Sequence, residues 1–151
     1  MSISTGTWVN AAAVQLGSRI QALGTLAPDI VTVVPRDEGH YQPAEAADWW
    51  VNVEQVSAET IAETSASYRV RFTLGVWVWK TSLGVLPTAA SDISLKAELV
   101  HKQLLYSDLA GWARTGIAND DMSVGQFVKS GQDNVRYGYH FTVVVTKQLG
   151  V

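Results

Sequence analysis

Residues Tyr68–Lys80 read YRVRFTLGVWVWK, the most regular stretch of the chain. Two sets of side chains alternate along it, as expected of a strand that buries one face in a core. The face predicted to enter the core comprises Tyr68, Val70, Phe72, Leu74, Val76 and Val78. The opposite face comprises Arg69, Arg71, Thr73, Gly75, Trp77 and Trp79. The stretch therefore predicts a long β-strand whose even-numbered residues are buried.

After this strand, the spacing of apolar residues predicts a helix. Ser91 or Asp92 can cap its start, and it is expected to run to about Ala113. Glu98 and Lys102 are four residues apart, a spacing that predicts a favourable ion pair. The face predicted to pack on the core comprises Ile93, Ala97, Val100 and Leu104.

The C-terminal part predicts a loop and one more strand. Residues Ile117–Arg136 are polar and glycine-rich, which indicates a functional loop or a short hairpin around Ser130 and Gly131. Tyr137–Lys147 alternates like the long strand and is predicted to be the last strand. Its faces comprise Tyr137, Tyr139, Phe141, Val143 and Val145 on one side and Gly138, His140, Thr142, Val144 and Thr146 on the other.

The N-terminal part predicts a helix and two shorter strands. From Thr7 to Leu23 apolar residues recur at helical spacing, and Gly24 ends the pattern. The β-branched run Asp29–Val34 lies between two prolines and predicts a strand. Trp49–Val53 predicts another, with Trp49, Val51 and Val53 on one face and Trp50 and Asn52 on the other. Ser57–Ser67 suits either a solvated turn or an irregular strand edge, and we assign it to neither.

In chain order the elements are α, β, β, long β, α, loop, β. This order predicts an α+β two-layer sandwich, in which two helices cover one face of a mostly antiparallel sheet. The chain has 151 residues, of which 47% are hydrophobic and 17% charged, so we expect a single domain over residues 1–151. A domain of this length hides about 70% of the surface that its unfolded chain exposes, which is enough for a core without disulfides or a structural metal.

The charge and hydropathy of the chain restrict its partners. Eleven Lys and Arg against fourteen Asp and Glu give a net charge of -3, which predicts no basic surface for sequence-specific binding of nucleic acid. No stretch reaches the roughly 18 uninterrupted apolar residues of a membrane span, and the N-terminus lacks the pattern of a secretory signal. We therefore expect a soluble protein, made in the cytosol, that does not bind membranes.

Few residues could carry catalysis or bind a metal. The three histidines, His40, His101 and His140, have no second His or carboxylate at metal-ligand spacing. The clusters Asp37–His40 and Asn119–Asp121 could hold a cation or act as acid and base, but solvated loops explain both more simply. No nucleophile elbow, dinucleotide fingerprint or phosphate loop occurs, and cysteine is absent. We therefore expect no enzyme, no catalytic, cofactor-binding or metal-binding residues, and no cofactor.

Tryptophan stands out, with six residues in the chain. Two of them share the odd-numbered face of the long strand with two arginines, and a third can project the same way. Trp and Arg are the residue types most enriched at the centres of protein interfaces. The alternative is that another part of the chain, such as Ile117–Arg136, folds over this face. The residues predicted to contact other subunits are Trp50, Arg69, Arg71, Trp77 and Trp79.

If the even-numbered face is core and the tryptophan face is an interface, substitutions on the two faces should have different effects. Phe72→Ala should cost about 3 to 5 kcal/mol of folding stability, the usual loss for emptying a buried aromatic site. Replacing both Trp77 and Trp79 with Ala should leave a folded chain whose association is weaker by at least about 2 kcal/mol.

Charge is divided unevenly along the chain. Residues 1–63 hold eight acids and two bases (-6), whereas residues 64–151 hold six acids and nine bases (+3). The stretch Asp37–Glu63 contains seven acids and no Lys or Arg. It can be a solvated region that keeps the protein soluble. It can also meet the basic part of a neighbouring copy in a head-to-tail contact that closes into a ring.

The layout resembles the tail-terminator proteins of long-tailed bacteriophages and the related neck or tail-completion proteins. The match lies in the order and periodicity of elements over nearly the whole chain and includes no diagnostic short motif. Two features depart from the family's pattern, the long insertion Pro35–Asp48 and the high tryptophan content. The matching elements are the helix Thr7–Leu23, the strand Asp29–Val34, the strand YRVRFTLGVWVWK, the helix SLKAELVHKQLL and the strand YGYHFTVVVTK.

The resemblance implies a structural virion protein that has no catalytic residues and forms a six-membered ring. Such a ring caps the tail tube and offers a surface to the head connector. The implied partners are further copies of the chain, the tail-tube protein and head-connector proteins, and the implied location is the tail or neck of the virion. The alternative is a small-ligand-binding α+β module or an enzyme, in which the aromatic face lines a pocket for a flat or sugar-like ligand.

Overall fold

A computed structural model of the chain describes residues 5–43, 47–63, 67–81, 86–105, 126–130 and 136–150. The helices among them are α1 (Thr5–Gln21), the short 3-10 helix η1 (Gly24–Leu26) and α2 (Leu86–Leu105). The strands are β1 (Ile30–Val34), β2 (Trp49–Glu63), β3 (Ser67–Thr81), β4 (Gln126–Ser130) and β5 (Arg136–Gly150). The predicted α+β class is confirmed.

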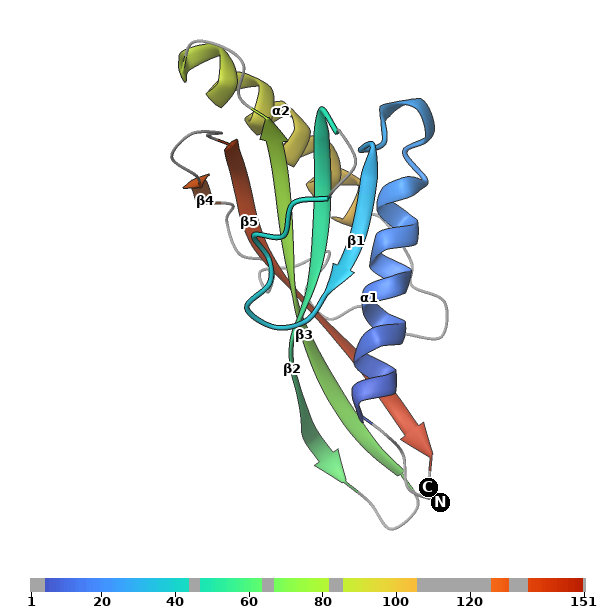
Figure 1. The fold of residues 1–151 in the computed structure, drawn as a ribbon. Helices are drawn as coiled ribbons and strands as arrows, with labels where there is room; N and C mark the ends of the chain where they lie inside the picture. Colours follow the sequence, from blue (N-terminus) through green and yellow to red (C-terminus); the bar gives the residue numbers. More distant parts are fainter. Residues whose placement is uncertain are drawn as a thin grey trace.

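One sheet contains all five of these strands, in the order β1-β2-β3-β5-β4. The three long strands, β2, β3 and β5, form its twisted centre (Figure 1). The β2–β3, β3–β5 and β5–β4 pairs are antiparallel, whereas β1 runs parallel to β2. A sheet that is mostly antiparallel was expected. The short strands β1 and β4 lie at its two edges.

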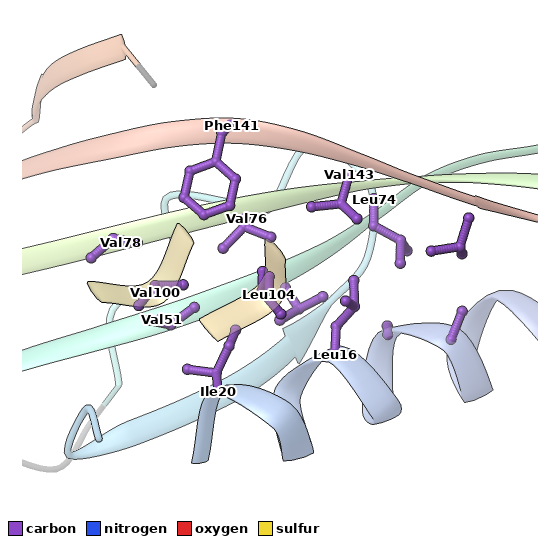
Figure 2. Packing of buried hydrophobic residues seen from close by; sticks show 14 of the residues in the cluster. Leu16, Ile20, Val51, Leu74, Val76, Val78, Val100, Leu104, Phe141 and Val143 are labelled. Atoms are coloured by element: carbon purple, nitrogen blue, oxygen red, sulfur yellow. The ribbon is translucent and has the colours of Figure 1, made fainter. Parts of the chain in front are cut away.

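Both helices pack on the same face of the sheet. α1 contacts β1 and β2, α2 contacts β3 and β5, and the two helices also contact each other. Figure 2 shows Leu16 and Ile20 of α1 directed at the valines and Leu74 of the sheet. This face is the hydrophobic core, so the prediction that two helices cover one face agrees with the structure.

The faces predicted to form the core are buried where the structure describes their side chains. The even-numbered face of β3 is completely buried from Val70 to Val78. The predicted helix faces are buried as well, at Ala12, Leu16 and Ile20 of α1 and at Ile93, Ala97, Val100 and Leu104 of α2. On β5 the buried residues of this face are Phe141, Val143 and Val145.

α2 begins earlier than predicted. It starts at Leu86, so Ser91 and Asp92 lie inside the helix and do not cap it. Pro87 stands in the first turn, where a missing backbone N–H costs no helical hydrogen bond. The predicted ion pair is confirmed, with Lys102 Nζ 2.9 Å from a carboxylate oxygen of Glu98. Residues 106–113, the predicted end of this helix, lie outside the described residues.

Pairing with β3 decides the stretch that the sequence left unassigned. Residues 57–63 continue β2, and the register shifts between Gln55 and Ser57 and between Thr60 and Ala62. These irregularities are typical of β-bulges and explain why the alternation was unclear. In the predicted loop Ile117–Arg136, β4 pairs antiparallel with β5, as the hairpin alternative requires.

Candidate functional site

Three tryptophans share the face of the sheet opposite the helices. Register places Trp50 of β2 beside Trp79 of β3, and Trp77 of β3 beside His140 of β5. The rings of Trp77 and Trp79 are nearly parallel, with their centroids 5.8 Å apart. The ring centroids of Trp77 and His140 are 4.0 Å apart. Strand register alone therefore gathers an aromatic cluster.

The segment between β1 and β2 passes across the sheet (Figure 1), and its residues contact this cluster. We call residues Pro35–Pro43 the strap. The carbonyl oxygen of Gly39 accepts hydrogen bonds from Trp79 Nε1 and from Asn52 Nδ2, both at 2.9 Å. Both donors are side chains of the sheet, so they hold the strap by its backbone at this point.

A second carbonyl of the strap is held in the same way. The Tyr41 oxygen accepts hydrogen bonds from Trp50 Nε1 at 3.2 Å and from Asn52 Nδ2 at 2.7 Å. Asn52 is fully buried and donates to both carbonyls. A buried amide needs such partners, because leaving its N–H groups unpaired costs about 1 to 3 kcal/mol.

The strap fits the cluster only because residue 39 is glycine. A Cβ atom built there would lie 2.1 Å from Trp77 Nε1, far inside van der Waals contact. Asp37 adopts a left-handed conformation (φ 70°), which lets the chain turn sharply before Gly39. The His40 ring then packs 4.8 Å from the Trp77 ring, measured between centroids.

Glu54 joins the strap to the sheet through its carboxylate. One oxygen accepts a hydrogen bond from Trp77 Nε1 at 2.6 Å, and the other accepts one from the backbone N–H of Asp37 at 2.9 Å. The Glu54 residue is only 6% exposed. A buried carboxylate is tolerated when charge-assisted hydrogen bonds replace its water. Both oxygens are occupied in this way, which indicates a structural role.

His140 lies beside this carboxylate, above a residue without a side chain. A Cβ atom built on Gly75 would lie 3.1 Å from His140 Nε2 and 3.3 Å from Glu54 Oε1. Burial lowers the pKa of His140, and this effect exceeds the opposing effect of the Glu54 carboxylate. His40 lowers it further. The geometry therefore favours a neutral imidazole stacked on Trp77.

Arg136, the first residue of β5, closes the other side of the cluster. Its guanidinium carbon lies 4.6 Å from the Trp79 ring centroid and 5.8 Å from that of Trp50. It also donates a hydrogen bond to the His40 carbonyl of the strap. Burial lowers the pKa of Arg136, but guanidinium stays charged in proteins. A cation over two indole faces adds about 1 kcal/mol or more per contact when it is partly desolvated.

The predicted interface residues are only partly brought together. The structure gathers Trp50, Trp77 and Trp79 but leaves Arg71 and Arg69 about 20 and 26 Å from Trp77 along β3, at the usual rise of a strand. The expectation that the tryptophan face is open is wrong for Trp50 and Trp79, which are 1% and 0% exposed. The cover is the chain itself, as in the alternative considered from the sequence, and among the described residues it consists of the strap and Arg136, the last residue of Ile117–Arg136. Most of Ile117–Arg136 lies outside the described residues.

Arg69, Arg71 and Trp77 keep some exposure. Arg71 forms a surface ion pair with Glu59, 2.8 Å between Nη1 and Oε1. Such exposed pairs contribute at most about 1 kcal/mol. A role of these residues in contacts between subunits stays a prediction.

Several residues of the cluster were not predicted as site residues. Asn52 and His140 do lie on the predicted faces, but Glu54, Gly39 and Arg136 carry no sequence signal of their own. Their roles depend on where the strap crosses the sheet. The Asp37–His40 cluster, considered as a cation or acid–base site, serves instead as the tip of the strap, and Asn119–Asp121 lies outside the described residues.

Two kinds of feature are absent from the described residues. Among them, no group of three or more His, Cys, Asp or Glu side chains could hold a metal ion. Within the same residues, no helix is both long and apolar enough to cross a membrane.

A different surface lies at the β1 edge of the sheet. Within the described residues, β1 pairs on one side only, with β2. Beside it, α1 and β1 line an open groove. Val14 of α1 is 47% exposed at this groove. The residues that line the groove are Val14, Gly17, Ser18, Gln21, Val31 and Val33.

Comparison with known proteins does not assign the chain to a family. No protein-family model matches the chain, and a search of curated proteins finds no match. The function is therefore inferred from the residues and their geometry.

Proposed function

We propose that this chain is a structural virion subunit that assembles with copies of itself into a ring at the head-proximal end of a phage tail. In this role it acts as a tail terminator or neck protein. Its partners are the neighbouring copies, the tail-tube protein and the head connector, and the ring has six members. The order of helices and strands from α1 to β5 supports the proposal, because it is the order on which the resemblance rests.

The observation that carries the proposal is the outer edge of β1, with which no strand of the described residues pairs. A ring subunit needs two different surfaces that complement each other on adjacent copies. A strand edge without a described partner, next to a groove that valines partly line, offers such a surface, because its backbone groups can pair with another chain. The unequal charge of residues 1–63 (-6) and residues 64–151 (+3) favours head-to-tail contacts of the same kind.

The alternative, a ligand pocket lined by the tryptophans, has less support. The strap fills the aromatic face, and its backbone carbonyls already bind the polar groups of Asn52, Trp50 and Trp79. A flat ligand would have to displace Gly39, which lies against Trp77. The face is therefore part of the fold, not an open pocket.

Native mass spectrometry and electron microscopy of the purified chain test the proposal. We expect closed rings, with a mass of six chains, at high protein concentration. In particles of the phage that encodes the chain, an antibody against it should label the junction between head and tail. A chain that stays monomeric at all concentrations and is absent from particles would contradict the proposal.

A further inference from the structure

β1 is an edge strand that carries none of the usual protection against pairing. Its sequence is IVTVV, without a charge, a proline or a bulge. Natural proteins usually protect an exposed edge with lysine, proline, a bulge or a covering segment, because a bare edge pairs with other chains. Among the described residues, no strand pairs with the outer side of β1.

A neighbouring edge of the same sheet is protected. Beyond Glu54, β2 has no β1 partner, and this free stretch carries the two register irregularities. It also contains Glu59 and Glu63. Bulges and charges are the devices that block edge pairing. Unlike this stretch of β2, β1 carries neither a bulge nor a charge, so within the described residues it is an edge that can pair.

The groove beside β1 gives a pairing strand apolar surface to bury. α1 approaches β1 closely at Gly17, where a Cβ atom would lie 3.1 Å from Val31 Cγ1. Val14, one turn earlier, remains 47% exposed. A strand added to β1 would extend the sheet over this side of α1 and cover Val14. Backbone pairing and apolar burial would then act together.

The opposite edge of the sheet is the complement of β1. β4 has five residues, as β1 does, and no described strand lies on its outer side. One parallel pair and three antiparallel pairs lie between β1 and β4, so these two strands run in opposite directions. Rotation about an axis along the strands keeps these directions, so β4 of one copy would meet β1 of the next as an antiparallel pair. Antiparallel pairs are slightly more stable per residue than parallel ones.

The charge of the two parts of the chain favours this contact over pairing of β1 with itself. β1 belongs to the part of the chain with charge -6, and β4, which contains Lys129, belongs to the part with charge +3. Pairing of β1 with β1 would bring two acidic parts together, whereas pairing with β4 joins opposite charges. We infer that β1 pairs with β4 of a second copy of this chain, so that the sheet continues from subunit to subunit. This inference rests on the proposed ring and names the surfaces that form it.

Cross-linking tests the inference directly, because the chain has no cysteine of its own. One protein carries Thr32→Cys, at the middle of β1, and a second carries Val128→Cys, at the middle of β4. The two are given tags of different size, mixed, and treated with a short bismaleimide. Within one chain these positions lie four strand spacings apart, roughly 19 Å, so the reagent reports contacts between copies.

We expect the mixed product, Thr32→Cys joined to Val128→Cys, to dominate. A product of Thr32→Cys with itself, without the mixed product, would overturn the inference in favour of a β1–β1 dimer. Rings that give neither product would also overturn it while leaving the proposed function intact. A strictly monomeric chain would overturn both.

A matched pair of lysine substitutions gives a second readout. Thr32→Lys places a charge on β1 and should raise the dissociation constant of the assembly about tenfold or more. Thr60→Lys makes the same change on the protected stretch of β2, where Thr60 is exposed, and should change it less than about twofold. Circular dichroism confirms that both variants are folded. Equal dissociation constants for two folded variants would contradict the inference.

Discussion

Gly39 and Trp77 lie so close together that a single methyl group could not be inserted between them. A Cβ atom at residue 39 would lie 2.1 Å from the indole nitrogen, and that nitrogen already donates to Glu54 at 2.6 Å. The indole cannot move away without breaking this hydrogen bond. The strap and the sheet are therefore fitted to each other.

Gly39→Ala should destabilise the fold. The added methyl group must push the strap or Trp77 aside, and overpacking of this kind costs about 1 to 3 kcal/mol. Denaturant unfolding followed by tryptophan fluorescence measures the loss. Gln42→Ala, at an exposed residue of the same strap, serves as the control and should change stability by less than about 0.5 kcal/mol. Equal stability of the two variants would show that the strap does not rest on Trp77.

Trp79→Ala should now behave like a core substitution. Trp79 and Phe72 are both 0% exposed although they lie on opposite faces of β3. Each change to Ala should cost about 3 to 5 kcal/mol in thermal or chemical unfolding. This reverses the sequence-based expectation that alanines at Trp77 and Trp79 leave the chain folded. Arg69→Ala, at an exposed residue of the same strand, should be nearly neutral.

Glu54→Gln should weaken the attachment of the strap. The amide keeps the size of the side chain, but its NH2 group would face a donor, either Trp77 Nε1 or the Asp37 N–H. We expect a loss of about 1 to 3 kcal/mol in the free energy of unfolding. Glu59→Gln on the same strand, which breaks only a surface pair, should cost about 1 kcal/mol at most. A smaller loss at Glu54 than at Glu59 would refute the role assigned to this carboxylate.

His140 should make stability depend on pH. Burial lowers its pKa below the ordinary value of 6.5, so below that pH the unfolded chain binds a proton that the folded chain does not. The stability that depends on a neutral His140 is fully present above pH 6.5 and is lost as the pH falls below this value. His140→Phe keeps a ring against Trp77 and removes the titration. Histidine titrates in roughly the range between pH 7.5 and 5. As the pH falls through this range, the free energy of unfolding should decrease less steeply for the variant than for the parent. Parallel curves for variant and parent would contradict the assignment.

Much of the fold was predictable because the core follows simple periodicities. The alternation in β3 placed Val70 to Val78 in the core, and helical spacing placed Leu16 and Ile20 there. The same alternation placed Trp77 and Trp79 together on the other face. What the pattern could not show is whether that face is covered, because the cover comes from a segment about 40 residues away along the chain.

The start of α2 and the length of β2 illustrate the same limit. Ser91 is a good capping residue by type, but the helix extends back to Leu86 and makes no use of it. Residues 57–63 have mixed composition, and pairing with β3 decides their conformation. In β2, pairing with β3 overrides local propensity. Glu54 and Arg136 act through the strap, and no local pattern signals such contacts.

Hydrogen exchange of the Trp79 indole N–H tests most directly that the strap closes the aromatic face within one subunit. This N–H is buried and donates to the Gly39 carbonyl at 2.9 Å. In a sample that sedimentation shows to be monomeric, NMR should find its exchange slowed roughly a hundredfold or more relative to the unfolded chain, because the strap must open first. Exchange as fast as in the unfolded chain would contradict the account and would return Trp50 and Trp79 to the set of exposed candidates for subunit contact.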